Sequence, residues 1–257
     1  MGVVIAVANQ KGGVGKTTTV INLGFALANL GRKVLLIDAD PQGNTTSGVT
    51  QNRNIKPNLY DALIRDVQID NVIYSLKDNK NHVRENIYLV PSNIDLAGAE
   101  IELVSMFLRE LRLKKVLDPI IDKYDYILID SPPSLGLLTI NALSSAHYVL
   151  IPLQCEYYAL EGITQLLKTI EIIRKNLNNN LDIIGVLLTM YNRTTLSQEV
   201  AEEARKFFKE KVFKTVIPRN VRLSEAPSFS LSIFEYAPDS PGALSYMELA
   251  KELIERA

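Results

Sequence analysis

Short apolar runs that could form buried strands recur along the whole chain. The first of them, VVIAVAN at residues 3–9, is continuous and does not alternate with polar residues. Continuous runs are typical of parallel strands that are covered on both faces of a sheet. The same pattern predicts further strands at residues 33–40, 86–92, 124–133, 147–153, 183–191 and 212–218.

Apolar residues at helical spacing occupy most of the segments between these runs. Helices are predicted at residues 17–30, where Gly31 follows as a C-cap, and at 159–176, 197–210 and 242–256. Polar stretches predict surface loops at 50–58 and 77–86 and a turn at 176–180. The alternation of strands and helices predicts one α/β domain over residues 1–257, with a mostly parallel twisted sheet covered by helices on both faces.

The composition fits a folded protein without a disulfide framework. The chain has 257 residues, of which 47% are hydrophobic and 22% are charged, so it can bury a sizeable core. Cys155 is the only cysteine, which excludes an internal disulfide and fits a reducing cytoplasm. Only His82 and His147 could join it as ligands, and we therefore expect no zinc site.

The N-terminal stretch MGVVIAVANQ lacks a basic leader, and we interpret it as a strand and not as a signal peptide. No window approaches the length of a membrane span. The net charge of −1 means that a nucleic-acid partner would need a local basic patch. We expect a soluble cytoplasmic protein.

The stretch ANQKGGVGKTTT at residues 8–19 nearly matches the phosphate-binding loop of P-loop ATPases. That pattern needs a glycine, four residues, and then Gly-Lys-Ser/Thr. Here Gln10 replaces the first glycine, and an extra lysine, Lys11, follows it. A strand before the stretch and a helix after it favour an ATP-binding loop over a Gly-rich turn that contains Gly-Lys-Thr by chance.

Each residue type in this loop suits one part of a nucleotide. Lys16 would contact the β- and γ-phosphates, and the Thr17 hydroxyl would bind Mg²⁺. The helix that starts near Lys16 would turn its positive end to the phosphates, and backbone N–H groups of the loop before it would point inward at them. These N–H groups belong to Gly12, Gly13, Val14 and Gly15.

Aspartates follow two other predicted strands and should lie near the loop, because ligands in open α/β sheets bind outside the carboxyl ends of strands. Asp130 in ILIDSPP would hold Mg²⁺, directly or through water. In LLIDADPQG, Asp38 and Asp40 come at the end of the second predicted strand, and Asp40 is our candidate for positioning the attacking water. Asp38 could equally well cap a turn.

Together, KGGVGKTT, DADPQGN and DSPPS resemble the deviant-loop ATPases of the ParA/MinD group. The segment IPRNVRLSEAPS at residues 217–228 is similar to the ParA branch, the Soj-type chromosome and plasmid partitioning ATPases. The resemblance implies that Lys11 reaches the ATP of a second subunit, so that two subunits enclose two nucleotides. Such a lysine would neutralise charge as an arginine finger does. The alternative is a solvated loop lysine.

The resemblance implies further roles for residues around the loop. Thr18 would contact the α-phosphate, and DPQGNTTSG and DSPPS would be the switches that sense the γ-phosphate. The adenine pocket would lie near Asn192 and the turn from Pro218 to Asn220.

A basic segment at residues 201–222 is the candidate DNA contact. It has seven Lys or Arg and three Glu, a balance of +4, so the rest of the chain carries −5. From charge alone, two interpretations of this segment are equally good: a surface that binds DNA, and the ordinary solvated face of an amphipathic helix. The ParA resemblance favours non-specific DNA binding in the ATP state, with Arg193, Arg219 and Arg222 as the predicted contacts. The chain starts directly with the loop strand, and we expect no operator-reading helix-turn-helix before it.

The resemblance as a whole predicts a slow ATP hydrolase that cycles between a monomer and an ATP dimer on the nucleoid. Its stimulating partner would be a ParB-type centromere-binding protein with a short basic N-terminal segment. A MinD-like membrane switch shares the nucleotide residues, but the last stretch, YMELAKELIERA, has three Glu against two Lys or Arg and predicts a packed helix. Iron–sulfur relatives need more cysteines than Cys155. Metabolic ligases need an organic-substrate motif, which we do not find.

Overall fold

The computed structural model describes residues 2–78, 80–156 and 161–257. Its seven strands are β1 (Val3–Val7), β2 (Val34–Asp38), β3 (Tyr74–Lys77), β4 (Val83–Val90), β5 (Tyr126–Asp130), β6 (Tyr148–Gln154) and β7 (Asp182–Thr189). They form one sheet in the order β3-β4-β2-β5-β1-β6-β7. All neighbouring strands are parallel except β3 and β4, so the predicted mostly parallel sheet is confirmed.

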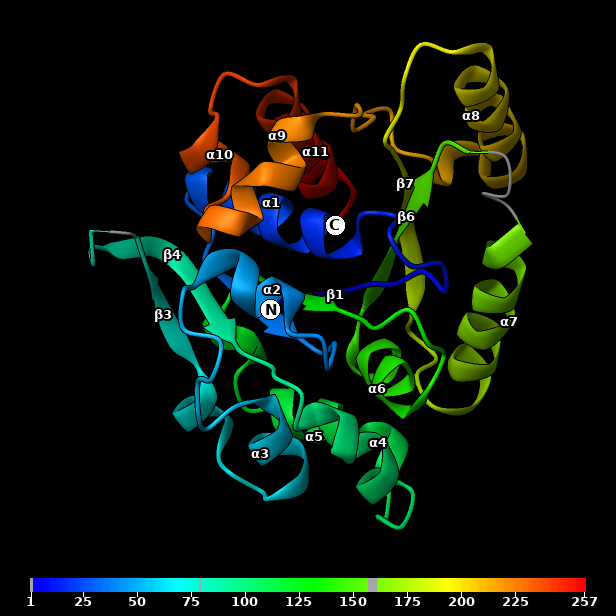
Figure 1. The fold of residues 1–257 in the computed structure, drawn as a ribbon. Helices are drawn as coiled ribbons and strands as arrows, with labels where there is room; N and C mark the ends of the chain where they lie inside the picture. The colour runs from blue at the N-terminus through cyan, green and yellow to red at the C-terminus, as the bar shows by residue number, and fades with distance from the viewer. Residues whose placement is uncertain (1, 79, 157–160) are drawn as a thin grey trace.

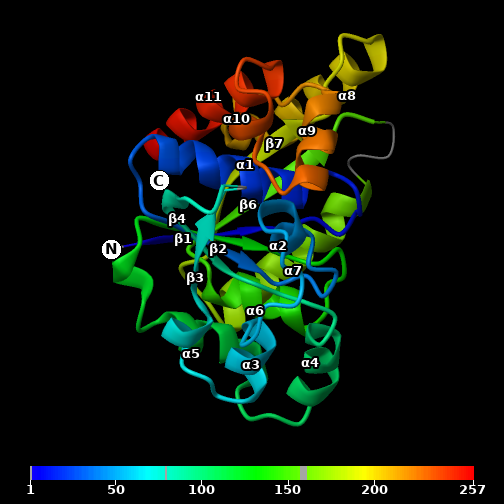
Figure 2. The same ribbon diagram turned by 60° about the vertical axis from the view of Figure 1, so that its left-hand side comes forward.

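Helices cover both faces of the sheet, as Figures 1 and 2 show. Those that connect or follow the first strands are α1 (Lys16–Asn29), α2 (Asn44–Val49), α3 (Leu59–Ile64), α4 (Leu96–Leu103), α5 (Arg112–Leu117) and α6 (Leu137–Ser145). The remainder are α7 (Glu161–Asn176), α8 (Thr195–Phe208), α9 (Val221–Glu225), α10 (Ile233–Tyr236) and α11 (Pro241–Arg256). Short 3₁₀ turns lie at Ile69–Val72, Arg109–Leu111, Ile121–Lys123, Lys209–Lys211 and Ala226–Phe229.

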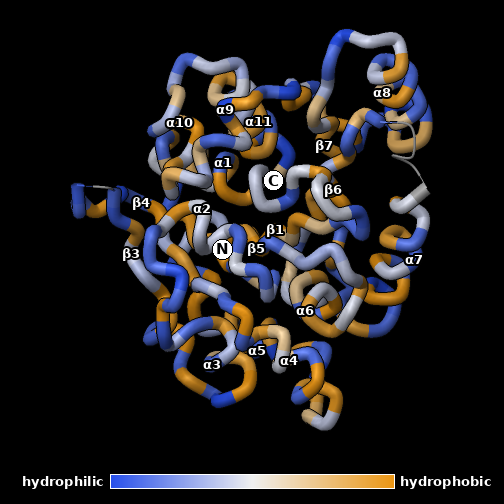
Figure 3. The backbone as a smooth tube through the Cα atoms, in the orientation of Figure 1, coloured by the Kyte–Doolittle hydropathy of each residue, from blue (hydrophilic) through white to orange (hydrophobic). Residues whose placement is uncertain are grey.

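The core consists of two apolar layers, one on each face of the sheet. Along β5, Ile127 and Ile129 enter the layer beneath α3 to α6, whereas Tyr126 and Leu128 enter the layer beneath α1 and α11. Successive side chains of a strand point to opposite faces, so a strand buried on both sides must be apolar at every position. This explains the continuous runs, which Figure 3 shows as orange segments of the tube.

Most predicted elements match the structure, with small shifts at their ends. Helix α1 ends at Asn29, and Gly31 follows with φ 77°, a conformation that favours glycine. The predicted loop at 50–58 is confirmed as irregular backbone, and the turn predicted at 176–180 begins after Asn176, the last residue of α7. Helix α7 matches the prediction for 159–176 from Glu161 onward, and residues 159 and 160 lie outside the described residues.

Two sequence predictions about the edges of the sheet are wrong. Residues 212–218 form no strand, and only single bridges join Val212 to Val186 and Pro218 to Tyr191. The polar stretch 77–86 is not all loop, because the antiparallel strands β3 and β4 reach into it. Among the described residues, no helix combines the length and the apolar character needed to cross a membrane.

Candidate nucleotide site

The loop between β1 and α1 has the backbone conformation of a phosphate-binding loop. Gly13 and Gly15 have φ values of 74° and 90°, which side chains with a Cβ rarely adopt. A Cβ added at Gly12 or Gly13 would meet no atom within 4 Å, so the loop borders open space at this point. The loop is fixed from outside, because the Thr189 hydroxyl donates to the Val14 carbonyl at 2.9 Å.

The two lysines of the loop differ in their surroundings. Lys16 is buried, and its Nζ donates to the backbone carbonyl of Lys11 at 3.1 Å. Burial lowers the pKa of the Lys16 ammonium, and the charges of Asp130 and Asp40 oppose that shift. The side chain of Lys11 is partly exposed and pairs with no carboxylate in the described part of the chain. Lys16 therefore points into the loop, while the Lys11 ammonium is available to another molecule.

Asp130 ends β5 directly beside the first turn of α1. Its Oδ2 accepts hydrogen bonds from the hydroxyls of Thr17 and Thr45, both at 2.8 Å. Its Oδ1 is buried and has no hydrogen-bond partner among the described residues. Burial raises the pKa of Asp130 to about 6, against the two hydroxyls, which lower it. A carboxylate with an unused oxygen next to a threonine hydroxyl is the hard oxygen donor set that Mg²⁺ prefers, so these residues fit this ion.

Asp38 is fully buried and fixes the segment that follows it. Its Oδ2 accepts hydrogen bonds from the backbone N–H and the hydroxyl of Thr46, both at 2.7 Å. Burial, followed by the negative charge of Asp130, raises the pKa of Asp38 to about 8. These bonds are those of a residue that anchors a turn, which was one of the two sequence interpretations of Asp38.

Asp40 lies near the loop, and only one of its two carboxylate oxygens accepts a hydrogen bond from the described residues. Its Oδ1 accepts the backbone N–H of Gln42 at 2.9 Å, and its backbone carbonyl accepts the Ser92 hydroxyl at 2.9 Å. Asp40 is close enough that its negative charge acts to raise the pKa of both Lys16 and Asp130. The structure thus brings Lys16, Asp40 and Asp130 to one place.

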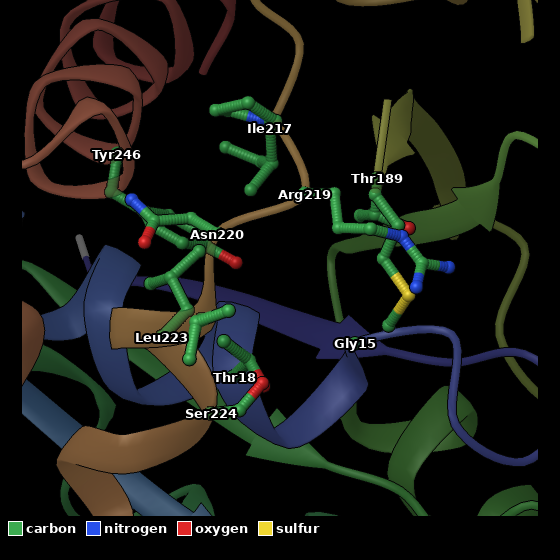
Figure 4. Close-up of a pocket in the computed structure, with 12 residues that line it drawn as sticks. Gly15, Thr18, Thr189, Ile217, Arg219, Asn220, Leu223, Ser224 and Tyr246 are labelled. Carbon is green, nitrogen blue, oxygen red and sulfur yellow. The ribbon is translucent and has the colours of Figure 1, made fainter. Parts of the chain in front are cut away.

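A cavity of about 210 Å³ adjoins the loop, on the side of α9 and α11. Figure 4 shows its lining residues around one space, with Gly15 and Thr18 from the start of α1. Pro218 and Asn220, which the resemblance placed near the adenine, both line this cavity. The sequence did not predict the other lining residues. Thr189, Met190 and Tyr246 come from distant segments without a local signal, and four more belong to the segment 217–228: Ile217, Val221, Leu223 and Ser224.

Asn192, which the resemblance placed near the adenine pocket, is not among the residues that line this cavity. Its Oδ1 accepts hydrogen bonds from the hydroxyls of Thr194 and Ser197, at 2.7 and 2.6 Å. Thr194 is the N-cap residue of α8, so Asn192 stabilises the start of that helix.

The three arginines predicted to contact DNA have different environments. Arg193 is exposed and has no ion-pair partner in the described residues. Arg222 pairs with Glu225 at 3.0 Å on the surface of α9. Arg219 lines the nucleotide cavity and pairs with Glu156 at 3.1 Å, so its side chain lies closer to the nucleotide site than the sequence suggested.

Comparisons with known proteins agree with this geometry. A model of the AAA domain family matches residues 2–183. The sporulation initiation inhibitor protein Soj of Bacillus subtilis is 54% identical over 98% of this chain and 98% of its own length. The chromosome partitioning protein ParA of Myxococcus xanthus is 50% identical over 100% of this chain and 89% of its own length.

Solved structures share the same fold over nearly the whole chain. Cobyrinic acid a,c-diamide synthase from Mycobacterium smegmatis, with bound ATP analogue and magnesium, is 38% identical with a TM-score of 0.84, over 99% of this chain and 95% of that one. The cell division ATPase MinD of Pyrococcus furiosus is 27% identical with a TM-score of 0.80, over 100% of both chains. With its deviant phosphate loop and half of its residues identical to Soj and ParA over almost their full length, the chain belongs to the ParA/Soj family of partitioning ATPases.

Proposed function

We propose that the protein is an Mg-ATP-dependent switch for chromosome or plasmid partitioning. It forms an ATP sandwich dimer, binds DNA without sequence specificity, and hydrolyses ATP slowly until a ParB-type partner stimulates it. It is cytoplasmic and associates with the nucleoid in the ATP state. The observation that carries the proposal is the pair of lysines in the loop: the Lys16 side chain is directed inward, and the Lys11 ammonium forms no ion pair with the described residues of its own subunit.

Each residue of the site has one role in this proposal. Lys16 and the loop N–H groups bind the phosphates, Thr17 and Asp130 hold Mg²⁺, and Asp40 orients the attacking water. Mg²⁺, when bound, neutralises charge on the phosphate oxygens. The cavity beside Thr18 takes the adenosine part of the nucleotide, where Pro218 and Asn220 supply contacts. Lys11 completes the site of the second subunit.

A MinD-like switch that positions a complex on a membrane is the second candidate, because MinD has this fold. Its identity to this chain is 27%, against 54% for Soj, and we therefore favour the partitioning role. Flotation with anionic liposomes and ATP, compared with DNA binding under the same conditions, distinguishes the two functions.

Replacing Lys16 with alanine is expected to abolish nucleotide-driven dimerisation. In this proposal the buried Lys16 ammonium binds the β- and γ-phosphates, and its loss should weaken ATP binding by about 100-fold or more. Isothermal titration with an ATP analogue measures the binding, and size-exclusion chromatography with ATP measures the dimer. Native ATP affinity in Lys16→Ala would contradict the assigned role.

Replacing Arg193 or Arg222 with alanine is expected to weaken ATP-dependent DNA binding at every sequence. Each contact occurs twice in a dimer, so the slope of log K against log salt should fall by about 2 for either variant. Lys211→Ala is the control, because Lys211 is not among the predicted contacts and its ammonium is held by Asp182 at 2.8 Å and by the Ile183 carbonyl, whereas Arg193 has no ion pair in the described residues. Equal salt slopes for the Arg222→Ala and native proteins would show that Arg222 does not contact DNA.

A further inference from the structure

The side chain of Arg84 is nearly buried, although the sequence around it predicted a polar surface loop. Arg84 belongs to β4, and only 7% of its side chain is exposed. Its guanidinium donates to the Glu235 carboxylate at 2.8 Å and to the backbone carbonyls of Val49 at 2.7 Å and Ser230 at 3.1 Å. It also lies over the ring of Phe25, 5.3 Å from the ring centre. A planar guanidinium that serves three acceptors fixes their positions relative to one another.

Val49 is the last residue of α2, the helix within the segment expected to sense the γ-phosphate. The last carbonyl groups of a helix have no partner inside it, and Arg84 supplies one for Val49. The Ser230 hydroxyl donates to the carbonyl of Ser47 in the same helix at 3.1 Å. Because α2 has only six residues, it is not stable by itself, and its contacts must fix its position. The carboxyl end of α2 is therefore held by Arg84 and by the segment around Ser230.

The amino end of α2 reaches the magnesium-site aspartate. The fully buried Thr45 donates its hydroxyl to Oδ2 of Asp130, and the Thr17 hydroxyl donates to the same oxygen, both at 2.8 Å. Thr17 belongs to α1 and Thr45 to α2. The two hydroxyls can therefore meet on one oxygen only while α1 and α2 keep their relative position. In this arrangement Oδ1 of Asp130 has no hydrogen-bond partner among the described residues.

The other contacts of Arg84 lead to α1. Glu235, its ion-pair partner, belongs to α10 and completes the capping box of that helix. The backbone N–H of Ile233, at the start of α10, donates to Oδ1 of the buried Asn22 at 2.8 Å. The side-chain amide of Asn22 in turn donates to the carbonyl of Thr18 in the first turn of α1, at 2.8 Å. Arg84 thus connects α2 to α10, which is hydrogen-bonded to α1.

We propose that Arg84 is a positioning residue of the magnesium site. It fixes α2 relative to α1, so that the Thr45 hydroxyl keeps its hydrogen bond to one oxygen of Asp130 and leaves the other oxygen available to Mg²⁺. The inference rests on the proposed function, because it takes Asp130 as a residue that holds this ion. The alternative is that Arg84 only stabilises the fold, without an effect that passes through Thr45.

The first measurement is amide hydrogen exchange of α2 in the full chain without nucleotide. Arg84→Lys keeps the positive charge beside Glu235, but an ammonium cannot reproduce the planar fork of donors. Arg84→Met keeps an unbranched apolar stem and removes every donor. In both variants the backbone N–H groups of α2 should exchange about tenfold faster or more, because the helix loses hydrogen bonds that hold its end. Arg53→Lys, the same change at an exposed arginine of the following loop, is the matched control and should exchange as the native protein does.

The second measurement is the Mg²⁺ concentration at which the affinity for a fluorescent ADP analogue reaches half of its full increase. Thr45→Val removes the hydroxyl but keeps the shape of the side chain, and it should raise this concentration about tenfold or more, as loss of a group that orients a metal ligand does. Arg84→Lys should raise it about threefold or more in the native background and should have no further effect in the Thr45→Val background. Affinity for the analogue without Mg²⁺ should stay within about twofold in all variants, because Lys16 and the loop are unchanged.

Three results would overturn the inference. Native exchange of α2 in both Arg84 variants would show that Arg84 does not fix this helix. A native Mg²⁺ requirement in Thr45→Val would show that Thr45 does not orient Asp130. Equal effects of Arg84→Lys in the native and Thr45→Val backgrounds would show that Arg84 stabilises the fold without acting through Thr45. The exchange experiment uses no nucleotide, so a native protein whose ADP affinity does not respond to Mg²⁺ contradicts the proposed function and leaves the test of the α2 contact intact.

Discussion

Replacing Lys11 with alanine is expected to leave ATP binding nearly unchanged and to abolish the ATP-dependent dimer. The side chain makes no ion pair within the described part of its own subunit, so ATP affinity should stay within about twofold. Hydrolysis should fall by about 10³-fold or more, which is the effect of removing a charge supplied in trans to the transferred phosphate. Loss of the ATP-dependent dimer without loss of ATP affinity is the result expected of a residue that acts on the nucleotide of another subunit.

The measurement is best made in an Asp40→Ala background, in which ATP is expected to persist. Size-exclusion chromatography with light scattering then gives the dimer fraction, and isothermal titration gives the ATP affinity. Lys77→Ala, which removes an exposed lysine on the edge strand β3, is the matched control and should dimerise normally. A Lys11→Ala protein that forms the full ATP dimer would show that the lysine is only a solvated loop charge.

The central part of the fold could be predicted from the sequence because its strands are buried on both faces. Four central strands, β1, β2, β5 and β6, are apolar on both faces up to their carboxyl ends. Asp38 is the last residue of β2, and Asp130 is the last residue of β5. The edge strand β3 is not buried on both faces and could not be predicted in this way. β3 is short and half exposed, so its apolar residues are too few to form a run. A search of the sequence for buried apolar segments therefore does not find a short edge strand.

The wrong strand at 212–218 has a different cause. Phe213 is fully buried against Gly185, where a Cβ would collide with its ring, and Ile217 is buried as well. These apolar residues fill the core beside β7, while their backbone makes only the two isolated bridges. An apolar run shows that a segment is buried, but it does not show that its backbone pairs with a strand.

The site could be predicted where its chemistry depends on neighbouring residues in sequence. The loop from Lys11 to Thr17 is contiguous, and its glycines, lysine and threonine identify it without the fold. The cavity beside it adds Met190 and Tyr246 from two distant segments, and no local pattern marks them. Asn192 follows β7 as a pocket residue would, but the hydroxyls of Thr194 and Ser197 occupy it.

Replacing Asp40 with alanine is expected to leave the ATP dimer intact and to prevent its dissociation. If Asp40 orients the attacking water, its loss should lower ATP turnover by about 10²-fold or more. Binding of ATP and of Mg²⁺ should persist, because Lys16, Thr17 and Asp130 are unchanged. The variant should remain on DNA as a dimer when ATP is added and should be released by high salt.

The variant Asp38→Ala serves as the comparison for Asp40→Ala, because a different effect is expected of it. Its two hydrogen bonds to Thr46 fix the start of α2, so Asp38→Ala should lower the melting temperature and disturb the switch segment. Asp40 makes one such bond, to the N–H of Gln42, and Asp40→Ala should melt close to the native protein. The experiment measures turnover, dimer fraction and melting temperature for both variants with ATP. An Asp40→Ala protein that stays monomeric with ATP would contradict the switch mechanism, since hydrolysis would then not be the step that ends the dimer.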